Sequence, residues 1–410
     1  MPARNDIRRI LAYTHNAIGL GHAVRTLAVV EGLRAALPGV DFLVLGGGSS
    51  PQLFLTRGIE TIKLPGLRHD LDAPGQPFRP RYLASLSLEA VLAWRQRIIA
   101  ESLAAFRPQV VLVEHSLAGL MGEASPLLAA ARRLRPGGHV LAHLSRGIYR
   151  NDPSPLVPDS QVCGLPPGIS VTQLYDVLYV LEERDVVDVN AEFFGADPAL
   201  EERIRYLGRV AARNPEELRS RDDAVAALGL RDRDFALLSL GRHGRLPELH
   251  ARLFASLRQC GWMDSGKAVL TVFDPYLGPE AEARIRSLPE AQGVRFLPFL
   301  PGLVEVMAAA GLVVCRAGYN TVNELLLTGA PALVIPESHP SREQERRAAG
   351  LSAERITVLD EQTCLGPGLE ELLAALAARP RRPCQPGCCR FDRYAVGERI
   401  AEDLCRLAAS

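Results

Sequence analysis

The clearest indication of the fold class is the segment Val313-Val314-Cys315-Arg316-Ala317-Gly318-Tyr319-Asn320-Thr321. It begins with a continuous apolar run, as expected for a strand that is buried on both faces of a parallel sheet. A turn that contains Gly318 follows, and we expect Thr321 to begin a helix, with Glu324 at the capping-box spacing three residues later. A buried strand, a glycine turn and a helix in this order are typical of a doubly wound α/β sheet.

The same alternation of strands and helices extends along most of the 410 residues. In the first half, apolar runs predict the strands Arg9–Thr14, Phe42–Leu45, Val110–Glu114, Val140–His143 and Val177–Leu181, and amphipathic runs predict the helices Ala23–Ala36, Leu86–Phe106 and Gly122–Arg133. In the second half, the predicted strands are Phe235–Ser239, Ala268–Val272, Val294–Phe296, Leu312–Cys315 and Pro331–Ile335. The predicted helices there are Glu248–Gln259, Leu303–Ala310, Thr321–Leu327, Arg342–Gly350, Leu369–Ala378 and Phe391–Ala408.

This pattern predicts an α/β protein with two doubly wound, Rossmann-like domains of similar size. We expect an N-terminal domain over residues 1–205, a C-terminal domain over 206–385, and a final helix within 386–410 that packs back on the N-terminal domain. Residues 379–387 contain three prolines and little pattern, so they are predicted to be a linker. Ligands of open α/β sheets bind at the carboxyl ends of the strands, which predicts a site in a cleft between the two domains.

Composition excludes several classes of protein. Lysine and arginine total 47, as do aspartate and glutamate, so the chain shows no overall basic surface for nucleic acid or anionic membranes. It has no run of 18 apolar residues and no recognisable leader, and we expect a cytoplasmic protein. The eight scattered cysteines favour free thiols. The one cluster, Cys384, Cys388 and Cys389, lacks a C-x-x-C pair and a histidine partner, so no metal site is predicted there.

The loop after the first strand carries the first candidate chemistry. Gly19 and Gly21 allow close approach of the backbone to a ligand, and the following helix start offers N–H groups and a positive dipole end. His22 stands at that helix start and is the candidate general base, with His15 and Glu114 or its neighbour His115 as substitutes on nearby strand ends. A tight turn with a helix-capping histidine is the structural alternative.

The second half has an equivalent loop after its first strand. Gly241 and Gly244 flank Arg242 and His243, and the arginine fork could hold a diphosphate. An ordinary surface turn explains the same residues. For Glu324, the functional alternative to a capping box is a carboxylate that accepts hydrogen bonds from ribose hydroxyls.

A basic stretch in the first half leaves peripheral membrane contact open. Residues 67–81 are polar and proline-rich, and the next predicted helix carries Trp94, Arg95 and Arg97. A domain helix with a solvated basic face accounts for these residues more simply than an acceptor site or a membrane patch. The oligomeric state is not predicted.

Several of these motifs resemble those of MurG-type, family 28 glycosyltransferases of the GT-B fold. The segment from Phe299 to Gln344 is similar to their nucleotide-binding half, and Gly19–His22 to their N-terminal glycine loop. A MurG-like branch of predicted glycosyltransferases is more similar still. It shares the runs GLGH (Gly19–His22), GYNT (Gly318–Thr321) with Glu324, and REQ (Arg342–Gln344).

The resemblance implies a donor site in the C-terminal domain. Phe299 and Leu300 would contact the nucleobase, Gly318 and Thr321 the diphosphate, and Glu324 the ribose, while Gln344 would bind sugar hydroxyls. Arg316, Asn320 and Glu343 complete the expected donor site, together with the loop from Gly241 to Gly244. Two positions depart from the family. Arg242 replaces a small hydroxyl residue, and Glu343 replaces the first glutamine of a pair, which puts an N-acetylglucosamine donor in doubt.

The resemblance also implies the reaction. We expect an inverting transfer of a sugar from a nucleoside diphosphate sugar, UDP-linked, to a hydroxyl or other nucleophile of a small-molecule or lipid acceptor, without an obligatory metal or cofactor. A nucleotide-sugar hydrolase that uses water as acceptor is the first alternative. A non-catalytic nucleotide-sugar-binding subunit is the second. A 2-epimerase lacks an identifiable carboxylate set, and a dehydrogenase lacks the third glycine of G-x-G-x-x-G.

Overall fold

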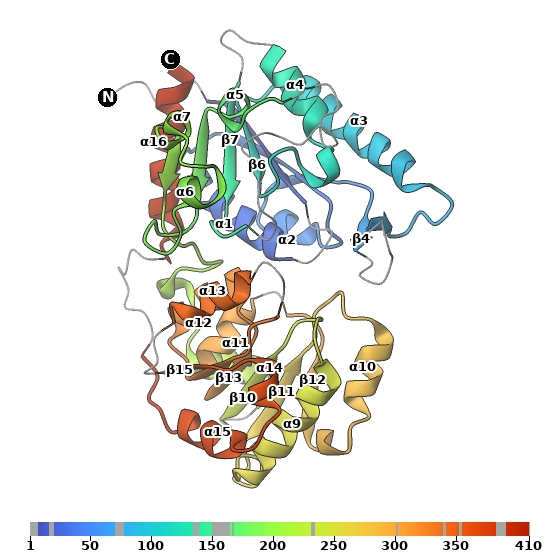
Figure 1. The fold of residues 1–410 in the computed structure, drawn as a ribbon, viewed down its shortest axis with the longest axis vertical. Coiled ribbons are helices and arrows are strands. Elements are labelled where there is room, and N and C mark those ends of the chain that lie inside the picture. The colour runs from blue at the N-terminus through green and yellow to red at the C-terminus, as the bar shows by residue number, and fades with distance from the viewer. Residues whose placement is uncertain are drawn as a thin grey trace. The chain divides into compact units, whose positions relative to one another are not determined.

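The computed structural model describes residues 7–15, 20–69, 78–133, 139–149, 165, 168–230, 234–300, 302–338, 342–351, 355–382 and 391–409. The chain forms two compact units (Figure 1). Unit 1 contains residues 1–210 and the C-terminal segment 392–410, and unit 2 contains residues 211–391. Each unit is built around its own parallel sheet.

The sheet of unit 1 has seven strands in the order β3-β2-β1-β6-β7-β8-β9. The strands are β1 (Arg9–Thr14), β2 (Asp41–Gly46), β3 (Glu60–Lys63), β6 (Val110–Glu114), β7 (Val140–Ser145), β8 (Val177–Val180) and β9 (Ile204–Tyr206). All of the pairings are parallel, and β1 pairs with both β2 and β6. A separate antiparallel hairpin joins β4 (Leu67–His69) to β5 (Phe78–Pro80).

Helices cover the sheet of unit 1. They are α1 (Gly21–Ala36), α2 (Gln52–Leu55), α3 (Leu88–Phe106), α4 (Ser125–Arg133), α5 (Val171–Leu174), α6 (Val189–Phe193), α7 (Pro198–Glu201) and α16 (Arg393–Ala409), with the 3₁₀ turn η1 (Leu120–Gly122). The red helix α16 comes from the other end of the chain but lies in unit 1 (Figure 1). It packs on α1, where Gly32 and Gly397 meet so closely that a Cβ on Gly397 would lie 2.1 Å from the carbonyl carbon of Gly32.

The sheet of unit 2 has six parallel strands in the order β12-β11-β10-β13-β14-β15. The strands are β10 (Phe235–Ser239), β11 (Ala268–Val272), β12 (Val294–Leu297), β13 (Leu312–Cys315), β14 (Ala332–Val334) and β15 (Ile356–Val358). The helices are α8 (Arg221–Ala227), α9 (Leu246–Gln259), α10 (Pro279–Arg286), α11 (Leu303–Ala309), α12 (Tyr319–Thr328), α13 (Glu343–Ala349), α14 (Glu361–Cys364) and α15 (Leu369–Ala377), with the 3₁₀ turns η3 (Pro215–Glu217) and η4 (Pro289–Ala291).

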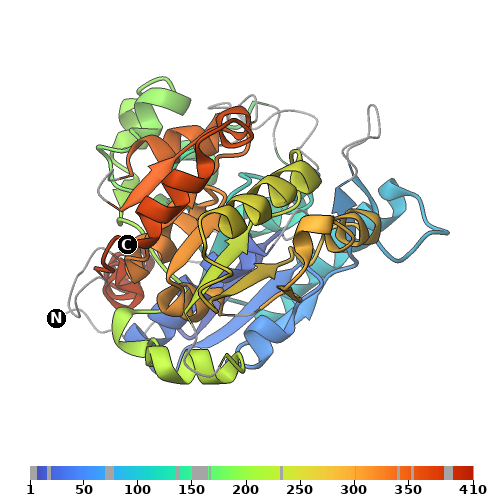
Figure 2. The same cartoon turned by 90° about the horizontal axis from the view of Figure 1, so that it is seen from below.

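Both faces of this second sheet are buried, which explains its continuous apolar strands. Phe235 and Leu237 of β10 belong to one apolar cluster, whereas Ala236 and Leu238 belong to another. Since neighbouring side chains of a strand point to opposite faces, the two clusters lie on the two sides of the sheet. Helices flank the strands on both sides, as the view from below also shows (Figure 2).

The predicted α/β class is confirmed, and most elements lie within a few residues of their predicted bounds. The prediction that Thr321 begins a helix with a capping box is wrong, because α12 begins at Tyr319 with Gly318 as its N-cap residue. Strands β3, β4, β5, β9 and β15 were not predicted. The side chains of β3 are exposed or half-buried, as expected at a sheet edge, so this strand lacks a continuous apolar run.

Two further expectations concern the surface. Arg95 was expected on a solvated face, but it is 1% exposed and forms an ion pair with buried Glu123, whereas Trp94 is 47% exposed. Cys260, Cys315, Cys364 and Cys405 are free thiols, and the cluster at 384–389 lies outside the described residues. Among the helices described, none is both long enough and apolar enough to span a membrane.

Candidate functional site

The centre of each sheet is the point where the chain reverses its direction of winding. In unit 1 this point lies between β1 and β6, which are adjacent although four strands separate them in sequence order. Ligands of open α/β sheets bind outside the carboxyl ends of the strands at such a point. The residues there are His15, directly after β1, and Glu114 and His115, at the end of β6.

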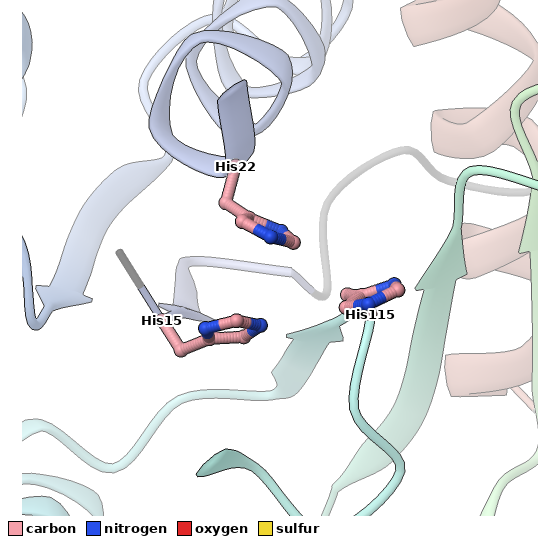
Figure 3. Close-up of side chains that lie close together, drawn as sticks. All are labelled: His15, His22 and His115. Atoms are coloured by element: carbon pink, nitrogen blue, oxygen red, sulfur yellow. The ribbon is translucent and has the colours of Figure 1, made fainter. Parts of the chain in front are cut away.

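Three histidines meet at this position (Figure 3). His15 and His115 come from the two strand ends and His22 from the first turn of α1, and their rings point toward one another. The ring centroids lie 4.1 Å apart for His15 and His22, 4.9 Å for His22 and His115, and 5.7 Å for His15 and His115. His115 has a φ of 67°, so its backbone takes the left-handed conformation that few side chains adopt. The structure therefore brings together all four predicted residues of this region.

Glu114 links His22 to the interior of unit 1. Its carboxylate oxygens lie 2.9 and 3.0 Å from Nδ1 of His22, and it also pairs with the buried guanidinium of Arg25. Burial alone would raise the pKa of Glu114, but the Arg25 charge and the contact with His22 outweigh it and hold the pKa well below its usual range. Nη2 of Arg25 also lies 3.1 Å from Nδ1 of His22. Because an ionised Glu114 can only accept and both of its oxygens lie closer, we assign the hydrogen to Nδ1, which leaves the lone pair of the neutral ring on Nε2.

The three histidines are neutral near pH 7. Burial lowers the pKa of His22, although the Glu114 charge opposes this. Burial and the proximity of His22 lower the pKa of His15, and burial and the Arg146 charge lower that of His115. A neutral imidazole with a free lone pair can accept a proton, which is what a general base requires.

The sequence did not identify Arg25 as part of this group. Arg25 is three residues after His22, so both side chains lie on the same face of α1. This spacing of three residues is the sequence signal that could have identified Arg25 as a neighbour of His22. Gly21 is the first residue of α1, and Gly19 lies outside the described residues.

Unit 2 repeats this arrangement with different residues. Its winding reverses between β10 and β13, where Ser239 pairs in register with Cys315. The loop from Gly241 to Gly244 follows β10, and α12 begins after β13. The two predicted motifs of this half therefore lie at neighbouring strand ends.

Arg316 holds the loops of this region together. Its guanidinium donates to the carbonyl oxygens of Leu240, His243 and Ile335, and to the carboxylate of Glu361 at 2.6 Å. Arg316 is 6% exposed, so its side chain acts as an internal brace for the loops. Glu361 was not predicted as part of the site, because it lies on α14, far away in sequence.

Position 244 requires a glycine, both for its backbone conformation and because there is no space for a side chain. Its φ is 90°, and a Cβ there would lie 2.2 Å from Oε1 of Glu361 and 2.6 Å from Nη2 of Arg316. Between the two glycines, the Nε of Arg242 donates to Nε2 of His243 at 3.0 Å, and its guanidinium lies 5.6 Å from the ring centroid of Tyr276. The loop therefore presents a cation that is stacked on an aromatic ring.

Helix α12 carries three more of the predicted residues, Asn320, Thr321 and Glu324. Because α12 begins at Tyr319, Asn320 and Thr321 are in its first turn, where backbone N–H groups can bind an anion. Glu324 lies on the next turn and is 9% exposed. Burial raises the pKa of Glu324 to about 8, so its carboxyl group is largely protonated at neutral pH.

Gln344 and Glu343 have protein partners in this structure. The amide oxygen of Gln344 accepts hydrogen bonds from the N–H groups of Ala317 and Glu337, and its nitrogen donates to the Glu337 carboxylate at 2.8 Å. Glu343 forms a buried ion pair with Arg347 at 2.7 Å. Gln344 thus connects the loop after β13 to the loop after β14. Phe299 and Leu300 are half-buried in the segment that follows β12.

Known proteins of one enzyme class are similar to this chain. Residues 275–389 match the glycosyltransferase family 28 C-terminal domain. A UDP-N-acetylglucosamine--N-acetylmuramyl-(pentapeptide) pyrophosphoryl-undecaprenol N-acetylglucosamine transferase from Desulforudis audaxviator is 28% identical over 387 residues, which cover 88% of each chain. The enzyme of the same name from Acidothermus cellulolyticus is 27% identical over 341 residues, or 80% of this chain and 78% of the relative.

Solved structures show the same fold at low sequence identity. The UDP-GlcNAc 2-epimerase from Neisseria meningitidis superposes with a TM-score of 0.61 at 13% identity, covering 97% of this chain and 100% of the other. The calicheamicin glycosyltransferase CalG4 gives a TM-score of 0.53 at 17% identity, covering 98% and 97%. These likenesses confirm the predicted fold, and the sequence matches confirm the resemblance to MurG-type enzymes. The chain has the GT-B fold, and its residues 275–389 match the glycosyltransferase family 28 C-terminal domain.

Proposed function

We propose that the chain is an inverting glycosyltransferase that moves a sugar from a UDP-linked nucleotide sugar to a hydroxyl or other nucleophile of a small-molecule or lipid acceptor. The observation that carries the proposal is the ordered pair of His22 and Glu114 at the winding reversal of unit 1, in a chain with a family 28 domain. The Desulforudis relative is named as a transferase of N-acetylglucosamine from its UDP derivative to a lipid-linked acceptor. A Staphylococcus aureus protein of similar fold, with a TM-score of 0.59, was solved with UDP.

Unit 1 supplies the base in this proposal. The acceptor oxygen attacks the anomeric carbon, its proton passes to Nε2 of His22, and the bond between that carbon and the diphosphate oxygen breaks with its electrons on the diphosphate. Glu114 fixes the hydrogen on Nδ1 and stabilises the imidazolium that forms. His15 and His115 are the neighbouring groups that border the same space.

Unit 2 binds the donor in this proposal. The first turn of α12, with Gly318, Asn320 and Thr321, and the loop from Gly241 to Gly244 bind the diphosphate. The positive end of α12 and the Arg242 cation offset the charge that develops on the leaving group.

The other predicted donor-site residues either contact the nucleotide or position the loops around it. Glu324 forms hydrogen bonds with the ribose hydroxyls, and Phe299 and Leu300 contact the nucleobase. We assign positioning roles to Arg316 and Gln344, because their polar groups already hold the surrounding loops. Glu343 has the same kind of role through its ion pair with Arg347.

A panel of nucleotide sugars tests the proposal. The purified chain is incubated with each donor, with and without candidate hydroxyl acceptors and lipid-linked acceptors, and released nucleoside diphosphate and glycosylated product are measured. Product that depends on acceptor, and that falls at least about 100-fold in His22→Ala, supports the proposal. Rapid release without acceptor identifies a hydrolase, and a new epimeric donor identifies an epimerase. Tight binding with neither reaction for any acceptor identifies a binding subunit, and each of these three outcomes overturns the proposed function.

A further inference from the structure

We propose that His15, His22 and His115 form a binding site for a divalent transition metal ion, of which Zn²⁺ is the best match. One ligand nitrogen from each of the three rings lies within 4.8 Å of the others (Figure 3). Imidazole nitrogen is a preferred ligand of Zn²⁺ and of other late first-row ions. The sequence predicted no metal site, because the three histidines are separated by up to 100 residues and share no ligand spacing.

His15 is the strongest observation for a missing ligand. Its side chain is almost fully enclosed, at 3% exposure, and neither ring nitrogen has a hydrogen-bond partner among the described residues. Nδ1 of His115 also lacks a partner there. Buried polar atoms nearly always have partners, because leaving one unsatisfied is costly. A metal ion among the three rings would satisfy nitrogens of both residues.

His22 has the environment of a metal-binding histidine. Glu114 accepts the hydrogen on Nδ1, which orients the ring and leaves the lone pair of Nε2 for a ligand. A histidine that donates its other nitrogen to a carboxylate is the usual arrangement around bound zinc.

Binding needs a small contraction of the cluster. Tetrahedral Zn–N bonds of about 2.0–2.1 Å place the ligand nitrogens about 3.3 Å apart. Rotation of the rings about χ2, a soft torsion for histidine, brings the nitrogens closer without moving the strands. Three protein ligands leave a fourth position for water.

The surrounding charges limit the affinity. Glu114 compensates the Arg25 charge, but the Arg146 charge also acts on all three histidines and disfavours a cation. We therefore expect weaker binding than at a structural zinc site and a site that exchanges its metal. A metal on Nε2 of His22 also removes the proposed base, so Zn²⁺ would inhibit the transfer. This last consequence rests on the proposed function.

Cobalt provides a direct test, because tetrahedral Co²⁺ absorbs visible light. The full chain is stripped with a chelator, dialysed and titrated with Co²⁺, and Zn²⁺ is then added in competition. We expect one equivalent of Co²⁺ per chain to bind and produce a visible absorption band. Added Zn²⁺ should displace the Co²⁺ and abolish the band. The affinity should fall at least tenfold in His15→Asn and in His115→Asn, and asparagine tolerates the left-handed backbone at position 115. Circular dichroism confirms that each variant is folded.

Matched controls separate this site from others. His69→Ala, outside the cluster, and a chain with Cys384, Cys388 and Cys389 changed to serine should bind Co²⁺ as the parent does. Absence of a band, binding unchanged in both asparagine variants, or binding of inorganic phosphate in place of Co²⁺ would overturn the proposal. A normal cobalt band with transfer that Zn²⁺ does not inhibit supports the metal site and contradicts the role of His22 as base.

Discussion

The carboxylate of Glu114 lies 2.9 Å from Nδ1 of His22 and also pairs with Arg25, so one buried carboxylate serves two partners on α1. For His22 it fixes the tautomer, and for Arg25 it balances a charge that is 2% exposed. In the proposed mechanism, catalysis and stability therefore depend on the same residue, and the two effects have to be separated by experiment.

We expect His22→Ala to reduce kcat by about 10²–10⁴-fold, because a positioned general base contributes that much. The binding of UDP should change little, since the proposed donor residues all belong to unit 2. Steady-state kinetics and calorimetric titration with UDP measure the two quantities. A variant that retains near-full turnover would remove His22 from the mechanism.

Glu114→Gln should reduce kcat by a similar factor and also destabilise unit 1 by about 3 kcal/mol, because Arg25 loses its carboxylate partner. The double variant Arg25→Met, Glu114→Gln removes the buried charge as well. We expect it to recover most of the stability, measured by thermal unfolding, but none of the activity. Recovery of activity would show that Glu114 acts only on folding.

The pH profile of kcat/KM should have its acidic limb below pH 6.5. Burial lowers the pKa of His22, so the neutral base persists to a lower pH than a free imidazole would allow. Glu114 raises this pKa by its charge and hydrogen bond, and its removal should therefore move the limb to still lower pH. Rate measurements from pH 4.5 to 8 in the parent and in Glu114→Gln test this sign. A limb that moves upward in the variant would be inconsistent with it.

Glu324→Gln should stabilise unit 2 at alkaline pH and weaken nucleotide binding. Because the folded pKa of about 8 lies above the unfolded value, the folded state binds more protons, and stability falls as pH rises from about 4.5 to 8. The variant removes this loss, which is on the order of a few kcal/mol at 1.36 kcal/mol per pKa unit. Melting temperatures of the two chains should agree near pH 4.5 and diverge toward pH 8. Titration with UDP measures the loss of affinity.

Arg316→Lys should destabilise unit 2 by about 2–4 kcal/mol. A lysine cannot reproduce the planar fork that reaches three carbonyl oxygens and Glu361. The two tryptophans provide a specific readout, since Trp262 is buried in unit 2 and Trp94 is in unit 1. In a Trp94→Phe background, Trp262 fluorescence during urea unfolding reports unit 2 alone. An unchanged transition would show that Arg316 does not brace the loops.

Gly397→Ala should destabilise unit 1 by about 2–3 kcal/mol, although alanine favours helices. The added Cβ meets the backbone of Gly32, so α16 must move away from α1. Glu398→Ala, at an exposed position on the same helix, is the matched control and should stay within about 0.5 kcal/mol of the parent. Thermal unfolding and hydrogen exchange in α16 distinguish the two variants. Equal behaviour would contradict close packing of the helices.

Local sequence patterns were sufficient to predict the strands that are buried on both faces. The runs Phe235–Ser239 and Leu312–Cys315 were predicted with their observed bounds, because a continuous apolar segment between turns has few other stable conformations. The edge strand Glu60–Lys63 has half-exposed, partly polar side chains, and its strand conformation depends on pairing with β2. It gives no periodic signal in the sequence.

The candidate site residues also divide into those that local sequence patterns indicated and those that depend on tertiary contacts. Glycine turns and a histidine at a helix start are local patterns, and they pointed to His22 and to the loop at Gly244. The bracing role of Arg316 and the link that Gln344 makes between two loops could not be predicted in this way, since their partners are up to 76 residues away in the sequence. The meeting of His15, His22 and His115 was decided by strand order. Adjacent parallel strands bring their carboxyl ends together whatever their separation along the chain, and that proximity leaves no pattern in the sequence.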